Sequence, residues 1–172
     1  MARYNAWMNE KIYQAASGLS DKARKEDRGA FFGSLHGTLN HILWGDLIWL
    51  QRFATAEWDA PALEGLSFDP VSSKTIHKTE VFADFAALTA ERAVIDAAIE
   101  EWADTNLTED ILTSDLNFWH TFRNKDMTLP MGLCVSHLFN HQTHHRGQAT
   151  TLLSQMGVDA GATDMIAMPR ED

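Results

Sequence analysis

The sequence predicts an all-α protein: a four-helix bundle with one long crossover and a short β-hairpin before the last long helix. Two observations carry this prediction. Apolar residues recur at intervals of three and four over long stretches, which is the period of an amphipathic helix. The 172 residues suffice for one domain with a sizeable core and would be cramped as two. We therefore expect residues 1–172 to form a single bundle domain.

The first two helices are expected before residue 59. Apolar residues of Ala2–Ser17 lie at helical spacing, and Gly18 is a natural stop. The second helix is expected over residues 31–58, where leucine and isoleucine side chains repeat every three or four positions. Both segments should therefore bury one face in the bundle.

A long crossover is expected to separate the second and third helices. Residues 59–78 contain Pro61, Gly65 and Pro70, a composition that interrupts regular structure. The third helix is expected over residues 79–103, which are rich in alanine. The crossover therefore joins helices that need not be neighbours.

The C-terminal third is expected to hold the hairpin and the longest helix. Segments 111–120 and 126–129 flank a turn-like sequence at 123–125, which favours a short hairpin. Pro130 suits the first turn of a helix, and the periodic stretch 131–157 predicts a helix about 40 Å long at roughly 1.5 Å per residue. A short tail helix is expected after Thr163.

Charge and cysteine content exclude several classes of protein. The net charge of −10 and a pI near 5.1 argue against a nucleic-acid partner, because phosphate binding needs clustered Lys and Arg. The single cysteine, Cys134, excludes an intrachain disulfide and a thiolate-rich zinc site, and it suits a reducing compartment. We find neither a signal-peptide pattern nor an apolar run of about 18 residues. A cytoplasmic protein without a membrane partner is expected.

Half of the eight histidines fall within nine residues of the last helix: His137, His141, His144 and His145. The pairs 137/141 and 141/145 are each four residues apart, which stacks their imidazoles on one helix face with Cβ atoms about 6 Å apart. Two neutral imidazoles at that spacing can bind one transition metal ion. The spacing does not choose between the pairs, and hydrogen-bonded core imidazoles would explain it too.

The second helix offers His36 and His41, which are five residues apart and cannot share one face. Gly37 and Gly45 lie four residues before and after His41, so this side of the helix is nearly bare of side chains. It could hold a neighbouring group or a substrate close to the backbone. A tight helix-packing notch would explain the glycines equally well.

Several short motifs together are more specific than any histidine pair. They are YNAWMN at 4–9, GTLNH at 37–41, DLIW at 46–49, NHQTHHRGQ at 140–148 and TDM at 163–165. With these motifs the chain resembles the DinB family, also called DinB/YfiT-like proteins, over almost its whole length.

The resemblance implies a four-helix bundle whose metal is held by one histidine of the second helix and two of the last. The matching positions are His41, His141 and His145. His144 then falls at a position often occupied by an aromatic residue, and the remaining histidines, such as His36 and His137, become neighbours rather than ligands. The implied cofactor is a divalent metal ion, zinc first and nickel second, since imidazole suits both.

Three imidazoles leave such an ion with an open position, as in catalytic rather than structural sites. The expected function is therefore metal-dependent activation of water or a thiol, by a hydrolase or a thiol S-transferase of unknown substrate. Relatives in the family include transferases that add a low-molecular-weight thiol to electrophiles. The alternative is a non-catalytic metal-binding or stress-related bundle. For either function, the expected protein partner is a second copy of the chain, in a homodimer.

Residues around the three histidines have secondary expectations. Asp46 should be a packing or ion-pair residue, with Arg146 as a candidate partner, because it is turned about 140° away from His41. Gln148 is three residues beyond His145 and could support that ring from behind.

Tryptophans are the remaining candidates for a substrate pocket. Trp7 and Trp44 are the better candidates for pocket walls, whereas Trp49 is expected in the core.

Overall fold

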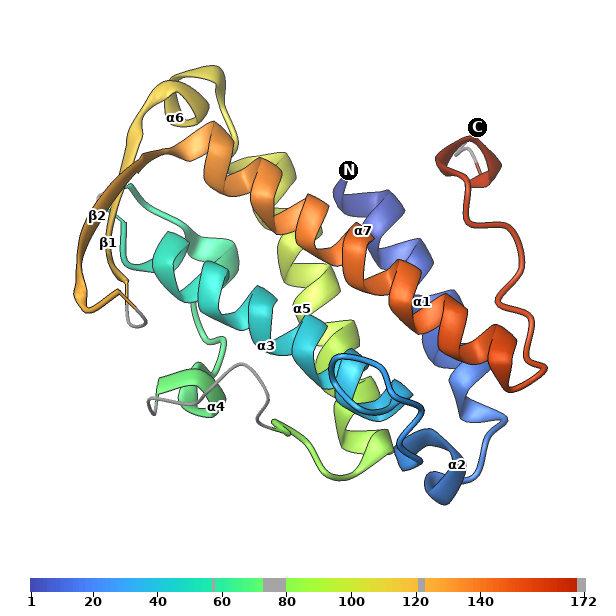
Figure 1. Cartoon of the computed structure of the whole chain (residues 1–172). Coiled ribbons are helices and arrows are strands. Elements are labelled where there is room, and N and C mark those ends of the chain that lie inside the picture. Colours follow the sequence, from blue (N-terminus) through green and yellow to red (C-terminus); the bar gives the residue numbers. More distant parts are fainter. Residues whose placement is uncertain (57, 73–79, 121–122, 170–172) are drawn as a thin grey trace.

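The computed structural model describes residues 1–56, 58–72, 80–120 and 123–169. Four long helices make up most of it, and Figure 1 shows them packed lengthwise: α1 (Ala2–Ser17), α3 (Leu35–Ala54), α5 (Phe85–Thr105) and α7 (Met131–Gln155). Helix α1 packs against α5 and α7, and α3 packs against the same two helices. The predicted four-helix bundle is confirmed.

Short elements occupy the connections. The crossover contains η1 (Pro61–Leu63) and α4 (Asp69–Ser72), and its residues 73–79 lie outside the described part of the chain. The remaining short elements are α2 (Asp21–Lys25), α6 (Glu109–Thr113) and the 3-10 turn η2 (Met165–Ala167). The sequence patterns predicted η2 as a tail helix but missed α2 and α6, because helices of five residues carry no periodicity.

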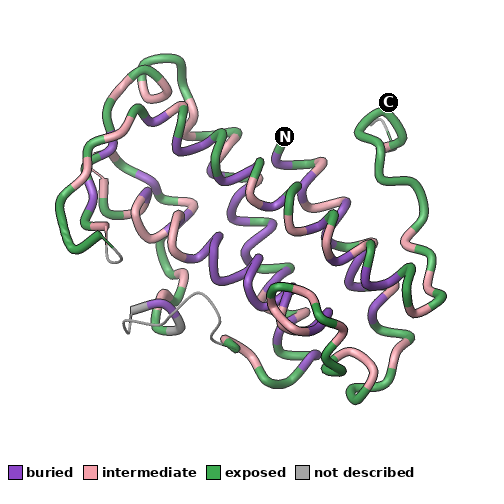
Figure 2. Tube along the Cα trace, in the orientation of Figure 1, coloured by how far each residue is buried: buried purple, intermediate pink, exposed green. Residues whose placement is uncertain are grey.

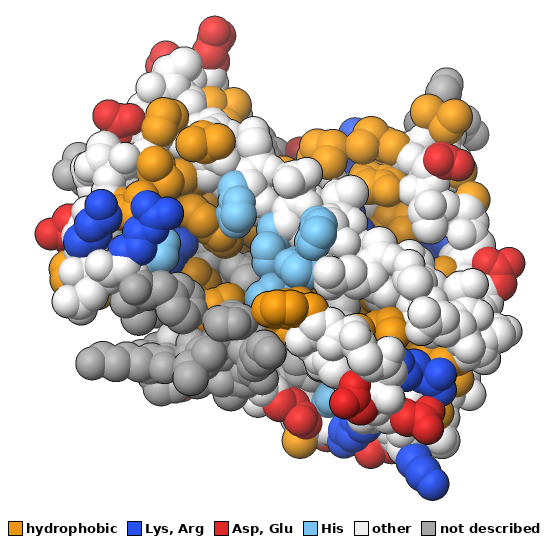
Figure 3. Space-filling model, in the orientation of Figure 1, with side chains coloured by type: hydrophobic (Ala, Val, Ile, Leu, Met, Phe, Trp, Pro, Cys, Tyr) orange, Lys and Arg blue, Asp and Glu red, His pale blue; other side chains and the backbone are white. Residues whose placement is uncertain are grey.

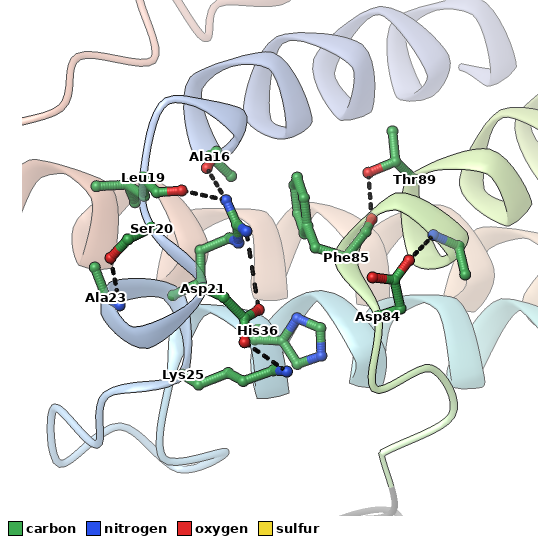
Figure 4. A network of polar contacts seen from close by, with 12 residues as sticks. Ala16, Leu19, Ser20, Asp21, Ala23, Lys25, His36, Asp84, Phe85 and Thr89 are labelled. Atoms are coloured by element: carbon green, nitrogen blue, oxygen red, sulfur yellow. Dashed lines mark hydrogen bonds and ion pairs between the residues drawn. The ribbon is translucent and has the colours of Figure 1, made fainter.

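Two helices begin later than the apolar pattern predicts, because side-chain caps fix their first turns. The Ser34 hydroxyl accepts a hydrogen bond from the Gly37 amide at 3.0 Å, so α3 begins at Leu35 rather than at residue 31. The Asp84 carboxylate accepts one from the Ala87 amide at 2.8 Å at the start of α5 (Figure 4). Residues 31–34 are thereby released from the helix into a loop.

Helix α2 closes one end of the bundle. Its Ser20 cap and the Asp21–Lys25 ion pair, 3.0 Å long, are seen in Figure 4 beside the end of α1. Arg24 donates hydrogen bonds to the Ala16 and Leu19 carbonyls and lies 4.2 Å above the Phe85 ring. These contacts join α2 to α1 and α5.

The predicted hairpin is confirmed as an antiparallel pair, β1 (Asp115–His120) and β2 (Lys125–Pro130), in which Leu116 lies opposite Leu129. Leu116 and Phe118 are buried and alternate with exposed residues, so one face of β1 packs on the bundle. Pro130 precedes α7 as its cap rather than lying inside the first turn. Residues 121 and 122, which directly follow β1, lie outside the described part of the chain.

Buried residues lie along the facing sides of the long helices, as the colouring of the trace in Figure 2 shows. The ring of Phe53 stacks on that of Trp102 at 4.7 Å, and both side chains are fully buried. None of the described helices has the length and apolar character that a membrane span requires.

A buried polar network crosses the middle of this core. Arg92 of α5 donates to Asp46 of α3 at 2.5 Å and to Asp96 at 2.9 Å. Gln142 of α7 also donates to Asp46 at 2.5 Å, and Asn9 of α1 donates to Asp96 at 2.9 Å. All four long helices therefore contribute to one network.

The network corrects one expectation. Asp46 is an ion-pair residue as predicted, but its partner is Arg92, whereas Arg146 donates to Asn5 and, at 3.0 Å, to Gln142. Burial raises the pKa of Asp46 to about 6, and the charge of Arg92 opposes this shift. Arg92 lies 46 residues away on another helix, so spacing within one helix could not reveal it.

Candidate metal centre

Three histidines from two helices converge on one point. The Nε2 atom of His41 on α3 lies 3.1 Å from that of His141 and 3.2 Å from that of His145, both on α7. If an ion lay about 2.0 to 2.1 Å from each of two nitrogens this far apart, the N–ion–N angle would be about 100°, close to the tetrahedral value. The three side chains could therefore hold one metal ion.

Glycine makes this convergence of α3 and α7 possible. A Cβ atom on Gly45 would lie 2.5 Å from Cε1 of His141, so the ring of His141 occupies the space that a side chain would need. A Cβ atom on Gly37 would lie 2.3 Å from the carbonyl oxygen of Phe32. The bare face of α3 thus holds a histidine ring at one glycine and the preceding loop at the other.

An aromatic residue that the sequence patterns missed covers the cluster. The ring of Phe32 stacks on His41 with centroids 3.8 Å apart and meets His145 edge-on at 5.3 Å. Residue 32 was expected inside the second helix, where its ring would have pointed elsewhere. The signal that could have found it is Gly33, whose φ of 76° interrupts a helix. Trp44 also stacks on His41, at 5.7 Å.

Burial favours the neutral form of two of the rings, those of His141 and His145. Burial, followed by the charges of His145 and His41, lowers the pKa of His141 to about 3. Burial also lowers the pKa of His145, opposed by its hydrogen bond to Gln148. A neutral imidazole offers a lone pair to a metal, so the low pKa values suit ligands.

Gln148 fixes the tautomer of His145. Its Oε1 lies 2.9 Å from Nδ1 of His145, and a carbonyl oxygen can only accept, so Nδ1 carries the proton. The lone pair of His145 is then on Nε2, facing the cluster. The contact expected behind His145 is confirmed.

The other histidines considered above lie outside the convergence point. The Nε2 atom of His36 lies 2.9 Å from the Phe82 carbonyl oxygen and 3.4 Å from the Glu80 carboxylate, in the segment that precedes α5. The His137 ring lies 5.8 Å from that of His141, and His144 is exposed beside Gln148. Within the described residues, the cluster is the group whose ligand atoms converge.

The tryptophans divide differently from the expectation. Trp7 lines a groove of about 910 Å³ between α1 and α5, which also reaches Asn9 and Asp96 and is not lined by the three histidines. Trp44 lies beside the cluster as expected. Trp49 is half-buried, with its ring 5.1 Å from His137. Figure 3 shows a group of histidine side chains at the surface near the middle of one face of the molecule.

Fold and site together define a class: a four-helix bundle with a three-histidine cluster between its second and last long helices. The chain belongs to the DinB family, whose model matches residues 1–171. It is 25% identical over 162 residues to Protein DinB of Bacillus subtilis (strain 168), covering 94% of this chain and 87% of that protein. The crystal structure of a DinB-like protein from Bacillus cereus has the same fold, with a TM-score of 0.60 and 19% sequence identity. The match covers 90% of this chain and 89% of that protein.

Proposed function

We propose that His41, His141 and His145 bind one divalent metal ion and that the protein is a metal-dependent enzyme. Zinc is the first candidate and nickel the second, because both accept neutral imidazole ligands. The observation that carries the proposal is the convergence of three Nε2 atoms from two helices, two of the distances being 3.1 and 3.2 Å.

The surroundings of the cluster favour a catalytic over a structural role. A fourth protein ligand would close the coordination sphere, and among the described residues no fourth ligand atom converges on these three. His36 faces Phe82 and Glu80, and His137 packs against Trp49. Three protein ligands leave a position for water or substrate. A metal ion bound there would lower the pKa of a coordinated water or thiol, which is the chemistry of a hydrolase or a thiol S-transferase.

Neighbouring residues of the protein fix the placement of the three histidine rings. Gln148 orients His145, and Gly45 lets His141 approach α3. Phe32 and Trp44 cover the ring of His41, which limits access of bulk water from their sides. These contacts prepare the three imidazoles before any metal arrives.

The test is elemental analysis of the purified protein and of His41→Ala, His141→Ala and His145→Ala. We expect about one metal ion per chain, as for one ligand set, and near-complete loss in each variant. His137→Ala is the matched control, because this histidine lies on the same helix beside the cluster and should retain the metal. Metal that survives the three substitutions but disappears in His137→Ala would contradict the assignment.

The reaction is then chosen by a substrate screen with the metal-loaded protein. Thiol cofactors with electrophiles test transfer, and ester and amide substrates test hydrolysis. Turnover that disappears in His141→Ala would support an enzyme. A fully loaded protein that is inactive on all of these and more resistant to unfolding would favour the second candidate, a non-catalytic metal-binding bundle.

A further inference from the structure

Cationic side chains gather at one end of the face that carries the histidine cluster, although the chain has a net charge of −10. Arg52 lies in the last turn of α3, and Arg123 and Lys125 lie in the hairpin. All three are close enough to His120 for their charges to lower its pKa, in addition to burial. Figure 3 shows Lys and Arg side chains at the left of this face with a histidine beside them, and apolar atoms between them and the histidines near the middle.

Arg52 is the cation of this group that the fold positions most firmly. Its guanidinium carbon lies 4.5 Å from the centroid of the Trp49 ring and 4.3 Å from that of Phe118, so two aromatic rings hold it. No carboxylate within the described residues forms an ion pair with it. Burial lowers the pKa of Arg52 to about 10, so the side chain remains a cation at neutral pH.

An aromatic surface connects Arg52 to the candidate metal centre. The ring of Trp49 lies 5.1 Å from that of His137, which lies 5.8 Å from that of His141. The charge of Arg52 also contributes to the lowered pKa of His137, after burial, so the guanidinium is near that ring as well. A continuous path of ring contacts therefore runs from the guanidinium to a proposed ligand.

We propose that Arg52 binds the anionic group, a carboxylate or a phosphate, of a small organic substrate whose reactive part lies at the three histidines. Trp49, Phe118 and His137 contact the apolar body of this substrate. The fork of N–H donors on a guanidinium matches the paired oxygens of both anions, and the Trp49 and Phe118 rings hold the guanidinium in place. This substrate class rests on the proposed function, because the histidines are its reactive end.

A purely structural role for Arg52 makes a different prediction. The contacts of Arg52 with Trp49 and Phe118 would then only attach the hairpin to α3, and an added anion would find no specific site. The two roles are separated by measuring anion binding directly in the metal-free protein, where an anion cannot coordinate an ion instead.

Benzoate and its neutral analogue benzamide form a matched pair of probes, and phenyl phosphate distinguishes a phosphate from a carboxylate. Each is titrated into metal-free protein at constant ionic strength, and the indole N–H signal of Trp49 is followed by NMR, because this ring lies 4.5 Å from the guanidinium carbon of Arg52 and is present in every variant. We expect saturable shifts with one or both anions and none with benzamide. Affinity should fall at least about tenfold in Arg52→Gln, less in Arg52→Lys, and not in Lys22→Gln, which removes an exposed charge on α2.

Equal binding of benzamide, unchanged affinity in Arg52→Gln or no saturable shift with either anion would overturn the subsite. Circular dichroism of each variant shows whether it is folded. If Arg52→Gln does not fold, Arg52→Lys, which keeps the positive charge, is compared with the unmodified protein instead. The metal analysis is independent of this titration. Anion binding at Arg52 in a chain that never retains metal would therefore refute the proposed function and leave the anion site standing.

Discussion

At the scale of single residues, the candidate metal centre depends on a glycine, Gly45, as much as on the three imidazoles. The ring of His141 fills the space beside Gly45, and Gln148 holds the proton of His145 on Nδ1. Both effects act on ligand placement before binding, and placement within a fraction of an ångström governs metal affinity.

Gly45→Ala should abolish or strongly weaken metal binding without unfolding α3. Alanine favours a helix by about 1 kcal/mol over glycine, but the new Cβ would displace the His141 ring from its position 2.5 Å away. Titration with zinc should show a loss of affinity of roughly tenfold or more. Gly147→Ala on α7 is the control, because its Cβ meets nothing within 4 Å. Equal affinity in the two variants would show that the notch is unnecessary.

The metal-free protein should lose stability as the pH falls from about 6.5. The folded-state pKa of His141 is about 3, below the ordinary value of 6.5, so between these values the unfolded state binds the extra proton. The slope due to one such group is at most about 1.4 kcal/mol per pH unit. Urea unfolding from pH 7 to 5, compared with His141→Gln, isolates this contribution. Parallel stability curves for the two proteins would contradict the shift.

At the scale of elements, the start of α3 decides what covers the histidines. Because Ser34 caps the helix, residues before it form a loop, and Phe32 lies against His41 rather than on a helix face. Gly33, at a φ of 76°, allows the reversal. The loop therefore contributes the aromatic cover of a site whose proposed ligands all come from helices.

Phe32→Ala should accelerate metal release more than it lowers the number of ions bound. The three imidazoles remain, but the ring stacked on His41 at 3.8 Å no longer shields them. We expect transfer of zinc to a chromogenic chelator to become roughly tenfold faster. Phe31→Ala is a matched control, because the neighbouring ring is 63% exposed. Identical release rates in the two variants would refute a shielding role for Phe32.

At the scale of the whole molecule, one buried polar network and one apolar core hold the four long helices. Asp46 and Asp96 share Arg92, and Gln142 and Asn9 complete the contacts from α7 and α1. Gln142 directly follows His141 on α7, so this network fixes the rotation of the helix that carries two proposed ligands. Fold and site are therefore coupled through the core.

Arg92→Gln should destabilise the fold by about 3 to 5 kcal/mol, because it leaves two buried carboxylates without their cation. Denaturant unfolding measures this loss as a lower midpoint. Arg28→Gln breaks the exposed Arg28–Glu26 pair and should cost no more than about 1 kcal/mol. A loss of similar size in both variants would mean that the buried network contributes little.

The sequence by itself determined the architecture and part of the site. Periodicity predicted the four long helices, and turn composition predicted the hairpin, because both depend on local backbone preferences and on which face is apolar. The spacing of histidines in the last helix marked a candidate metal site. It could not choose between His137 and His145, since both lie four residues from His141; the family motifs assigned the ligand positions.

Only the tertiary structure decided which distant groups meet. The Nε2 of His41 is brought to those of His141 and His145 across an interface between α3 and α7, and Arg92 reaches Asp46 from a third helix. Phe32 reaches His41 because the Ser34 cap makes α3 begin only at Leu35, after Phe32. The physical reason is common to all three cases: periodicity specifies which face of a helix is buried, whereas helix packing, caps and loop geometry specify what that face meets.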